Sequence, residues 1–191
     1  MFLSDVFDYI KGGKDPNKKT TMPNELMIVK KIQKNAMQNS KFIPSRFIDE
    51  KLPFKLDDKY FLQKEDIIIS LKEPYKASAN SEDLELKVLI PNNYVVLRNI
   101  DKKKYNYLFV VNYLNIIGIE NLVNNKSFNA DLTIDDVKNI SLPDISLYKQ
   151  ESLLSLLDSI NERAISYELI KDNDMEIAKH VMKDILGDNN V

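Results

Sequence analysis

Cysteine is absent from the 191 residues, and histidine occurs once, as His180. A chain without thiols can form no disulfide and no thiolate zinc site, and one imidazole cannot provide the histidine cluster that holds a transition metal. Uninterrupted apolar runs are also short: residues 108–111 form one of the longest, against the ~20 residues that a membrane helix needs. We therefore expect no metal site, no cysteine nucleophile and no transmembrane helix.

Signals for export and for catalysis are missing as well. Residues 1–10 carry Asp5 and Asp8 and lack the basic start and apolar centre of an export signal, which predicts a cytoplasmic protein. Residues 12–14 (Gly-Gly-Lys) lack the spacing of a phosphate-binding loop, and acidic pairs such as Glu65-Asp66 are not followed by the lysine pattern of a nuclease. An Asn-Pro-Pro-aromatic stretch, which would hold a flipped adenine, is absent. The sequence thus predicts a protein that is not an enzyme.

The net charge of −2 hides an asymmetry between the two ends of the chain. Residues 11–46 contain nine basic and two acidic residues, a net charge of +7 that suits the phosphates of a nucleic acid. Residues 131–191 contain thirteen acidic and six basic residues, a net charge of −7 that a polyanion would repel. We expect the first end to contact nucleic acid and the second to face solvent or a protein partner. Ordinary surface lysines are the alternative interpretation of the basic end.

Turn residues punctuate short apolar stretches over residues 1–145, which predicts an α+β domain with an irregular mixed sheet. The predicted strands are rich in Ile, Val, Leu and Phe, and they cover residues 26–29, 42–48, 66–71, 84–90 and 94–97. Residues 105–117 are apolar on nearly every side and predict a buried helix that Gly118 terminates. A short helix is expected to start at Thr133, whose hydroxyl can cap the free amides while Asp135 and Asp136 face the positive end of the helix dipole.

Residues 146–191 form a second predicted domain, a spacer and dimerisation helix over residues 147–186. Its apolar residues recur at alternating spacings of four and three, the seam of a coiled coil, and they predict this dimer interface: Leu153, Leu157, Ile160, Ala164, Tyr167, Ala178, Val181 and Ile185. The same register places Lys171 and Asp174 on the seam, so the helix is either continuous through residues 171–174 or kinks or turns there. An amphipathic helix folded back on its own domain is the alternative to a dimer.

Five stretches, in their order along the chain, resemble the specificity subunits of type I restriction-modification systems. Residues 3–14 (LSDVFDYIKGGK) are similar to the opening segment of that family and its glycine-containing loop. Residues 62–71 (LQKEDIIISL) resemble a strand entered through a Lys-Gly-Asp turn, with Glu65 in place of the usual glycine. Residues 90–98 (IPNNYVVLR) resemble the strand after the second recognition loop, and residues 107–115 the helix that follows it.

The most specific stretch is residues 134–150, which end in ISLPDISLYKQ. It resembles the family's passage from a short helix through a proline-containing strand to a Gln that opens the spacer helix. Asp144 stands where a second proline is common, and the preceding loop, residues 124–129, lacks the glycine that the family leads us to expect.

Full-length family members have two target-recognition domains and two spacer helices that pair antiparallel, so one of each implies a half-length specificity subunit. The resemblance implies that the recognition domain reads one half of a bipartite site in double-stranded DNA and that the chain binds no cofactor. It also implies methyltransferase subunits, which bind S-adenosylmethionine themselves, as partners, and it leaves the translocating restriction subunit open as a further one. Pairing with a second copy, as a homodimer, or with another half-length subunit would complete the plan.

Two alternatives remain open at this point. One is a decoy or regulatory half-subunit that binds methyltransferase without productive DNA targeting. The other is a self-contained nuclease with a borrowed recognition domain, which would require metal-dependent cutting by the purified chain.

Three loops combine positive charge with amide or aromatic side chains and are the predicted DNA contacts. Lysines would meet phosphates, while a few side chains, such as Asn17 on adenine, would reach base edges in the major groove. The loops cover residues 11–21, 72–81 and 98–107, and the predicted contact residues are Lys14, Asn17, Lys18, Lys19, Lys72, Tyr75, Lys76, Arg98, Lys102, Lys103 and Lys104.

Overall fold

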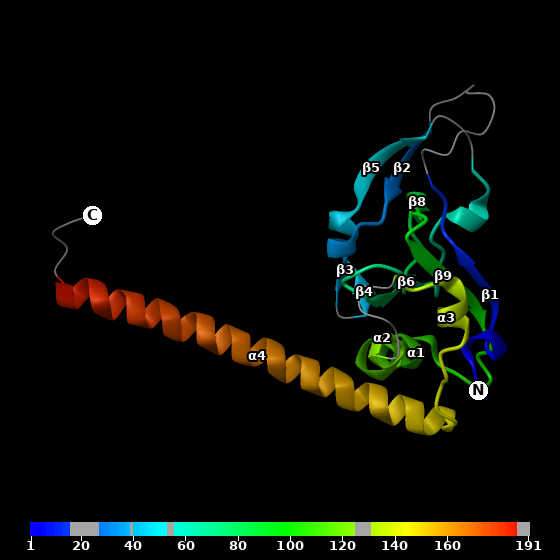
Figure 1. Ribbon diagram of the computed structural model, residues 1–191. Coiled ribbons are helices and arrows are strands. Elements are labelled where there is room, and N and C mark those ends of the chain that lie inside the picture. The colour runs from blue at the N-terminus through cyan, green and yellow to red at the C-terminus, as the bar shows by residue number, and fades with distance from the viewer. Residues whose placement is uncertain (16–26, 39, 53–55, 125–130, 187–191) are drawn as a thin grey trace. The chain divides into compact units, whose positions relative to one another are not determined.

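The computed structural model describes residues 1–15, 27–38, 40–52, 56–124 and 131–186 (Figure 1). The chain divides into two compact units, Met1–Gln150 and Glu151–Val191. The first unit is a mixed α+β structure, and the second continues a long helix, so the predicted fold class is confirmed.

A six-stranded sheet forms the centre of the first unit, in the order β1-β9-β6-β7-β4-β3. Its strands are β1 (Phe7–Gly12), β3 (Met37–Gln38), β4 (Lys41–Phe42), β6 (Ile67–Ser70), β7 (Ala77–Ala79) and β9 (Tyr94–Ile100). All pairs are antiparallel except β4 with β7, which makes the sheet mixed. All four residues of β6 are buried, as expected of a strand that is covered on both faces.

A second sheet has three strands in the order β5-β2-β8. They are β2 (Met27–Lys31), β5 (Ile48–Leu52) and β8 (Val88–Leu89). The strands predicted at 26–29, 66–71 and 94–97 are confirmed with shifted ends. Of the strand predicted over 84–90 only two residues form β8, and a single strand over 42–48 is wrong. Pro44 begins a 3-10 turn there, Pro44–Arg46, because its fixed φ and missing N–H favour the first position of a turn over the middle of a strand.

Apolar side chains from both sheets form the core. Ile32, Ile68, Ile90 and Val96 belong to one buried cluster. A second cluster lies at the three-stranded sheet and contains Val29, Leu52, Phe61 and Leu89. These clusters hold the ends of the strands, and therefore the first residues of the loops that follow them, in fixed positions.

The first helical segment is longer than predicted. It runs through α1 (Tyr107–Tyr113), a π turn (Leu114–Gly118) and α2 (Ile119–Asn124) (Figure 1). Helix α1 packs against β7. The prediction that Gly118 ends the helix is therefore wrong. A Cβ atom at Gly118 would lie 3.2 Å from Leu114 and 3.3 Å from Ile140, so this glycine serves the close approach of the segment around Ile140.

The predicted cap at Thr133 is confirmed at the start of α3 (Ile134–Lys138). The Thr133 hydroxyl accepts a hydrogen bond from the Asp136 amide at 3.2 Å, and the Asp136 carboxylate accepts one from the Thr133 amide at 2.7 Å. This reciprocal arrangement satisfies two backbone donors that a helix start leaves free, and it accounts for the acidic residues without a catalytic role.

The long helix α4 (Leu147–Leu186) contains 40 residues, with the predicted ends. It is continuous through residues 171–174, so the alternative of a kink or a turn there is wrong (Figure 1). Within the described parts of the chain, no helix has the length and apolar content that a membrane span requires.

Candidate nucleic-acid interface

Two of the predicted contact loops lie at one end of the six-stranded sheet. Gly12, the last residue of β1, pairs with Val95 near the start of β9, and Ser70, the last residue of β6, pairs with Tyr94. Lys14 and the β6–β7 loop, residues 71–76, therefore leave the sheet at the same end. Four predicted residues from separate parts of the sequence thus follow the same end of the sheet: Lys14, Lys72, Tyr75 and Lys76.

The β6–β7 loop is held at both of its ends. The Leu71 amide donates to the Asn93 carbonyl at 3.0 Å, and the Ser70 hydroxyl donates to the Lys72 carbonyl at 2.7 Å. On the other side, the Asn115 side chain accepts from the Ala77 amide at 2.8 Å and donates to the Ala77 carbonyl at 2.9 Å. The π turn contains Asn115, so the helical segment positions this loop.

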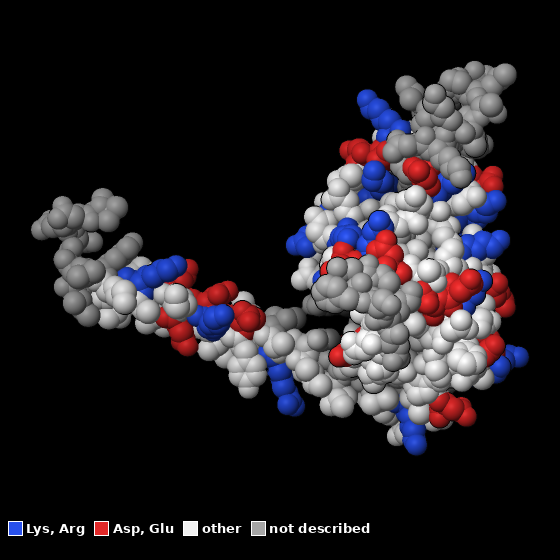
Figure 2. Space-filling view, in the orientation of Figure 1, with Lys and Arg blue, Asp and Glu red and all other residues white. Residues whose placement is uncertain are grey.

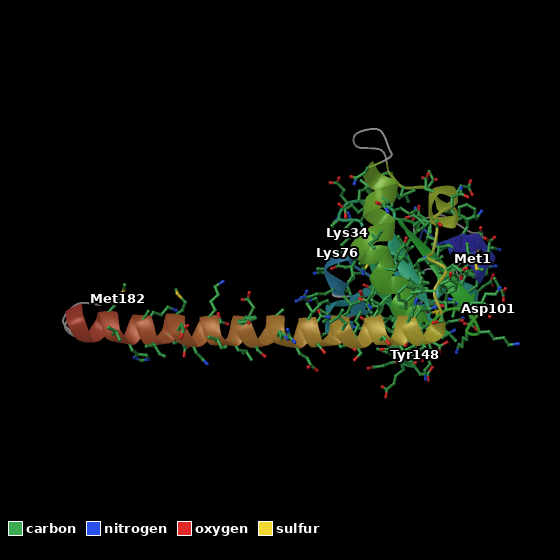
Figure 3. All side chains as sticks on the ribbon, turned by 90° about the horizontal axis from the view of Figure 1, so that it is seen from below. Met1, Lys34, Lys76, Asp101, Tyr148 and Met182 are labelled. Atoms are coloured by element: carbon green, nitrogen blue, oxygen red, sulfur yellow. The ribbon has the colours of Figure 1, made fainter. Side chains whose placement is uncertain are left out.

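Two further basic residues, which the sequence patterns did not single out, lie beside this loop. Lys34 Nζ donates to the carbonyl oxygen of Glu73 in the β6–β7 loop, and an Arg46 Nη donates to the Asn35 carbonyl at 2.8 Å. Lys34 and Lys76 lie on the same side of the first unit in Figure 3. We call Lys34, Arg46, Lys72 and Lys76 the basic surface. The +7 charge of residues 11–46 is the signal that could have identified Lys34 and Arg46.

Positive side chains of the basic surface are exposed to solvent. Lys72 Nζ lies 3.5 Å from an Asp131 carboxylate oxygen, and both side chains remain more than half exposed. Lys76 and Arg46 are exposed and form no ion pair with any residue in the described ranges. Figure 2 shows basic and acidic side chains intermingled over one face of the first unit, so lysines without a carboxylate neighbour are more informative than the overall count.

The third predicted loop lies elsewhere. Ile100, at the far end of β9, pairs with Phe7, so residues 102–104 follow the opposite end of the sheet, roughly 20 Å along the strand from Tyr94. Asp101, the preceding residue, lies on the other side of the unit from Lys34 and Lys76 in Figure 3. Lys102 pairs with Glu65, and Lys104 lies 3.4 Å from Asp101. Residues 102–104 therefore do not share one contact surface with Lys72, Tyr75 and Lys76.

Arg98 is not available to DNA, and its prediction as a contact is wrong. Its side chain is 10% exposed, and its Nε and one Nη each donate to the Asp66 carboxylate at 2.6 Å. The guanidinium also donates to the Phe61 carbonyl at 3.0 Å and lies over the Tyr9 ring. Burial raises the pKa of Asp66, while Arg98 and the Gln63 amide lower it. Arg98 therefore compensates a buried charge, because an unpaired carboxylate inside a protein is costly.

Several predicted residues lie outside the described ranges. Asn17, Lys18 and Lys19 fall in residues 16–26, and the side chain of Ile185 belongs to the undescribed end of α4.

The other predicted interface residues lie on α4 with apolar side chains open to solvent. The exposed fractions are 43% for Leu153, 50% for Ile160, 71% for Tyr167 and 49% for Val181. Leu157 is half-buried, and Ala164 and Ala178 are exposed. Exposed apolar side chains therefore recur along the described part of α4 at the spacing that a coiled-coil seam requires.

The start of α4 is fixed to the first unit by Gln150, whose side chain is fully buried. Its Oε1 accepts from the Asn106 amide at 2.9 Å, and its Nε2 donates to the Lys104 carbonyl at 2.8 Å and the Ile145 carbonyl at 3.1 Å. The resemblance had marked a Gln at this place without giving it a role. The structure shows that it joins the loop before α1 to the first turn of the helix.

No three His, Asp or Glu side chains of the described ranges gather as metal ligands. The candidate binding features among the described residues are the basic surface, the hydrogen-bonded β6–β7 loop and the exposed apolar side chains of α4.

The fold that combines these features is that of the specificity subunits of type I restriction-modification systems, present here at half length. The HsdS subunit from Thermoanaerobacter tengcongensis superposes with a TM-score of 0.69 at 15% sequence identity, over 96% of this chain and 47% of that one. A chain from a structure concerned with complex assembly and conformational transition of the type I system gives a TM-score of 0.69 at 15% identity, over 98% of this chain and 48% of that one. The chain thus spans about half the length of both, as the resemblance predicted. No protein-family model and no curated protein matches the sequence.

Proposed function

We propose that this chain is a DNA-specificity subunit of a type I restriction-modification system, without catalysis of its own, that directs methyltransferase subunits to a bipartite site. The observation that carries the proposal is the likeness of fold over 96% of the chain, which takes in both the mixed-sheet unit and the long helix. A protein that merely shared the sheet would not also share a helix of this length.

The first unit would read DNA. Lys14 and the basic surface supply charges that phosphates can meet, and the β6–β7 loop adds the ring of Tyr75 beside them. Phosphate contacts set affinity and position, while side chains from the recognition loops contact base edges.

The second unit would assemble the protein. Pairing of α4 with α4 of a second copy gives two identical recognition units, and a two-fold dimer matches a two-fold symmetric, interrupted DNA site. Methyltransferase subunits, and the restriction subunit where one is present, would dock on this dimer.

The first test is the solution mass by light scattering, on the chain alone and then with the methyltransferase subunit encoded beside it. We expect a mass near twice 22.1 kDa that increases when methyltransferase is added. A persistent monomer would exclude the homodimer and point to a second half-length subunit. Methyltransferase binding together with no sequence preference on DNA would identify a decoy.

DNA reading is tested by selecting from random duplexes and then measuring affinity against salt. We expect one enriched motif, and we expect Lys34→Gln with Lys76→Gln to reduce the salt slope by about one unit for each phosphate that the variant no longer neutralises. Lys59→Gln with Lys64→Gln removes the same charge from lysines that already pair with Asp57 and Asp83, and it should leave the slope unchanged.

Residues 102–104 are tested by their triple glutamine variant in the same assay. An unaltered slope would remove that loop from the interface. Plasmid incubated with the purified chain and magnesium should stay intact, because the proposed subunit has no catalysis of its own. Cleavage would instead identify the chain as a nuclease.

A further inference from the structure

Arg46 differs from the lysines of the basic surface in the way its charged group is held. Its Nη1 donates to the Asn35 carbonyl at 2.8 Å and, more weakly, to Gln38 Oε1 at 3.4 Å. The side chain is nevertheless exposed, and it forms no ion pair with a residue of the described ranges. The guanidinium is therefore oriented by the protein while its charge stays available to a ligand.

The backbone that carries Arg46 is fixed as well. Pro44 begins the 3-10 turn that contains Arg46, and the amide of Phe47 donates to the Pro44 carbonyl at 3.0 Å. The Phe47 side chain is 7% exposed and belongs to a buried cluster of the core. The Ile43 amide donates at 2.8 Å to the carbonyl of Ala36, the last residue of a second 3-10 turn. Because the side chain and its backbone are already ordered, a contact through Arg46 costs little conformational entropy.

The hydrogen bonds of Arg46 leave one edge of its guanidinium open. This group carries five N–H donors in one plane, and the two on Nη1 face Asn35 and Gln38. Among the residues that the structure describes, none accepts a hydrogen bond from Nε or Nη2. The Nε and Nη2 donors point the same way and form a fork that two adjacent acceptors can meet at once.

Guanine is the base that matches such a fork. In the major groove it presents two adjacent acceptors, O6 and N7, whereas adenine places an amino donor beside its N7 and cytosine presents an amino donor. A phosphate also offers two oxygens to an arginine, but its oxygens surround the phosphorus and accept from many directions. A fork that the protein holds in one orientation suits the flat edge of a base, because a base accepts only in its own plane.

Lysines flank Arg46 where phosphates would lie. Lys34 precedes Asn35 in the turn that holds Arg46, and its Nζ donates to the Glu73 carbonyl in the β6–β7 loop. Lys76 belongs to the same loop and lies on the same side of the first unit as Lys34 (Figure 3). Phosphate contacts from these two lysines would fix the register in which Arg46 meets one base pair.

We propose that Arg46 reads a guanine in the major groove of the DNA site through its Nε–Nη2 edge. This inference rests on the proposed function, of which it names a specificity-determining residue. Lys34 and Lys76 supply affinity for the backbone, and Arg46 sets the identity of one base pair.

Arg46→Lys tests the proposal, because it keeps the charge and removes the fork. Both proteins, as full chains, select from random duplexes, and affinity is then measured for each base at each position of the motif. We expect the wild-type chain to prefer guanine at one position by roughly 5–150-fold, and we expect the variant to lose that preference while the rest of the motif is kept. The salt slope should stay the same, since no positive charge is lost. Arg163→Lys, the same substitution at an exposed position of α4, should keep the complete motif.

Base analogues test the same contact without a change in the protein. Deazaguanine at the selected position lacks N7, and it should weaken binding of the wild-type chain by about tenfold and leave binding of Arg46→Lys unchanged. Inosine keeps N7 and O6 and lacks only the amino group in the minor groove, so the wild-type chain should bind it as it binds guanine. A loss of affinity with inosine and none with deazaguanine would place the reading in the minor groove and overturn the proposal.

The remaining outcomes separate this inference from the proposed function. A motif that is identical for the wild-type chain and Arg46→Lys, with the same preference at every position, would overturn the role of Arg46 and leave the proposed function standing. An equal loss of affinity for every sequence would assign Arg46 to a phosphate and overturn its role in reading. A wild-type chain that enriches no motif would remove the proposed function and this inference with it.

Discussion

At the scale of single residues, Arg98 and Asp66 form the most deeply buried ion pair among the described residues. Arg98→Met leaves a buried carboxylate without its partner and should lower the free energy of unfolding by about 3–5 kcal/mol. Burial already raises the pKa of Asp66, and removal of Arg98 raises that pKa further. Protonated Asp66 is tolerated and ionised Asp66 is not, so the loss of stability should be greater at pH 8 than at pH 5. Urea unfolding at the two pH values measures the difference.

Lys103→Met is the control for this substitution, since it removes a positive charge from an exposed side chain and should change stability by less than about 0.5 kcal/mol. Weaker DNA binding by Arg98→Met with unchanged unfolding would return Arg98 to the interface.

Glu65 occupies a backbone conformation that favours glycine. Its φ is 63°, and the resemblance had placed it where glycine is usual. We expect Glu65→Gly to raise the free energy of unfolding by about 0.5–1 kcal/mol, because relief of the left-handed strain outweighs the exposed ion pair with Lys102. Glu82→Gly, at a position without positive φ, should lower the stability by a similar amount. Thermal melts of the two variants should therefore move in opposite directions.

These residues also mark what a sequence can predict at this scale. The departure at Glu65 could be noted from the sequence because the resemblance marks a Lys-Gly-Asp turn there, and a turn is a local pattern; its positive φ is a finding of the structure. The burial and pairing of Arg98 could not be predicted, because its partner Asp66 is 32 residues away and contacts it only when β6 pairs with β9.

At the scale of elements, Gln150 connects α4 to the loop before α1. Gln150→Ala removes the acceptor of the Asn106 amide and the donor of two carbonyls, and we expect it to cost about 2–3 kcal/mol. The Asn106 amide should lose protection against hydrogen exchange, while the amides of β6 keep theirs. Lys149→Ala changes an exposed neighbour and should preserve the protection at Asn106. Equal protection in both variants would show that the start of α4 is held by other contacts.

Helix ends divide into those that local chemistry determines and those that packing determines. Thr133 and the limits of α4 were predicted, since a cap and a sustained apolar spacing are properties of the adjacent residues. Gly118 was misread as a helix stop because a glycine that admits a close neighbour has the same local pattern as one that ends a helix. The division of the basic loops between two ends of the sheet depends on strand pairing, which no charge count reports.

At the scale of the whole molecule, the opposed charges of the two ends agree with a division of labour. Under the proposed function, the negative charge of the C-terminal end would discourage DNA from binding along α4, and the positive charge of the N-terminal end would attract phosphates to the recognition unit. In the proposed dimer, two-fold symmetry would supply the second recognition unit that a chain of half the relatives' length lacks.

A dimer with two recognition units should bind a two-fold DNA site more tightly than a monomer does. Leu157→Asp with Ile160→Asp places charge in the seam and should reduce the solution mass from about twice 22.1 kDa to 22.1 kDa. Affinity for a duplex with one half-site should be unchanged, whereas affinity for the two-fold site should fall by about a hundredfold, because the second contact is no longer intramolecular. Ser155→Asp with Ser166→Asp adds the same charge away from the seam and should keep both properties. A monomer that still held the two-fold site as tightly as the dimer would mean that one recognition unit reads the entire sequence, and the spacing role of α4 would then be lost.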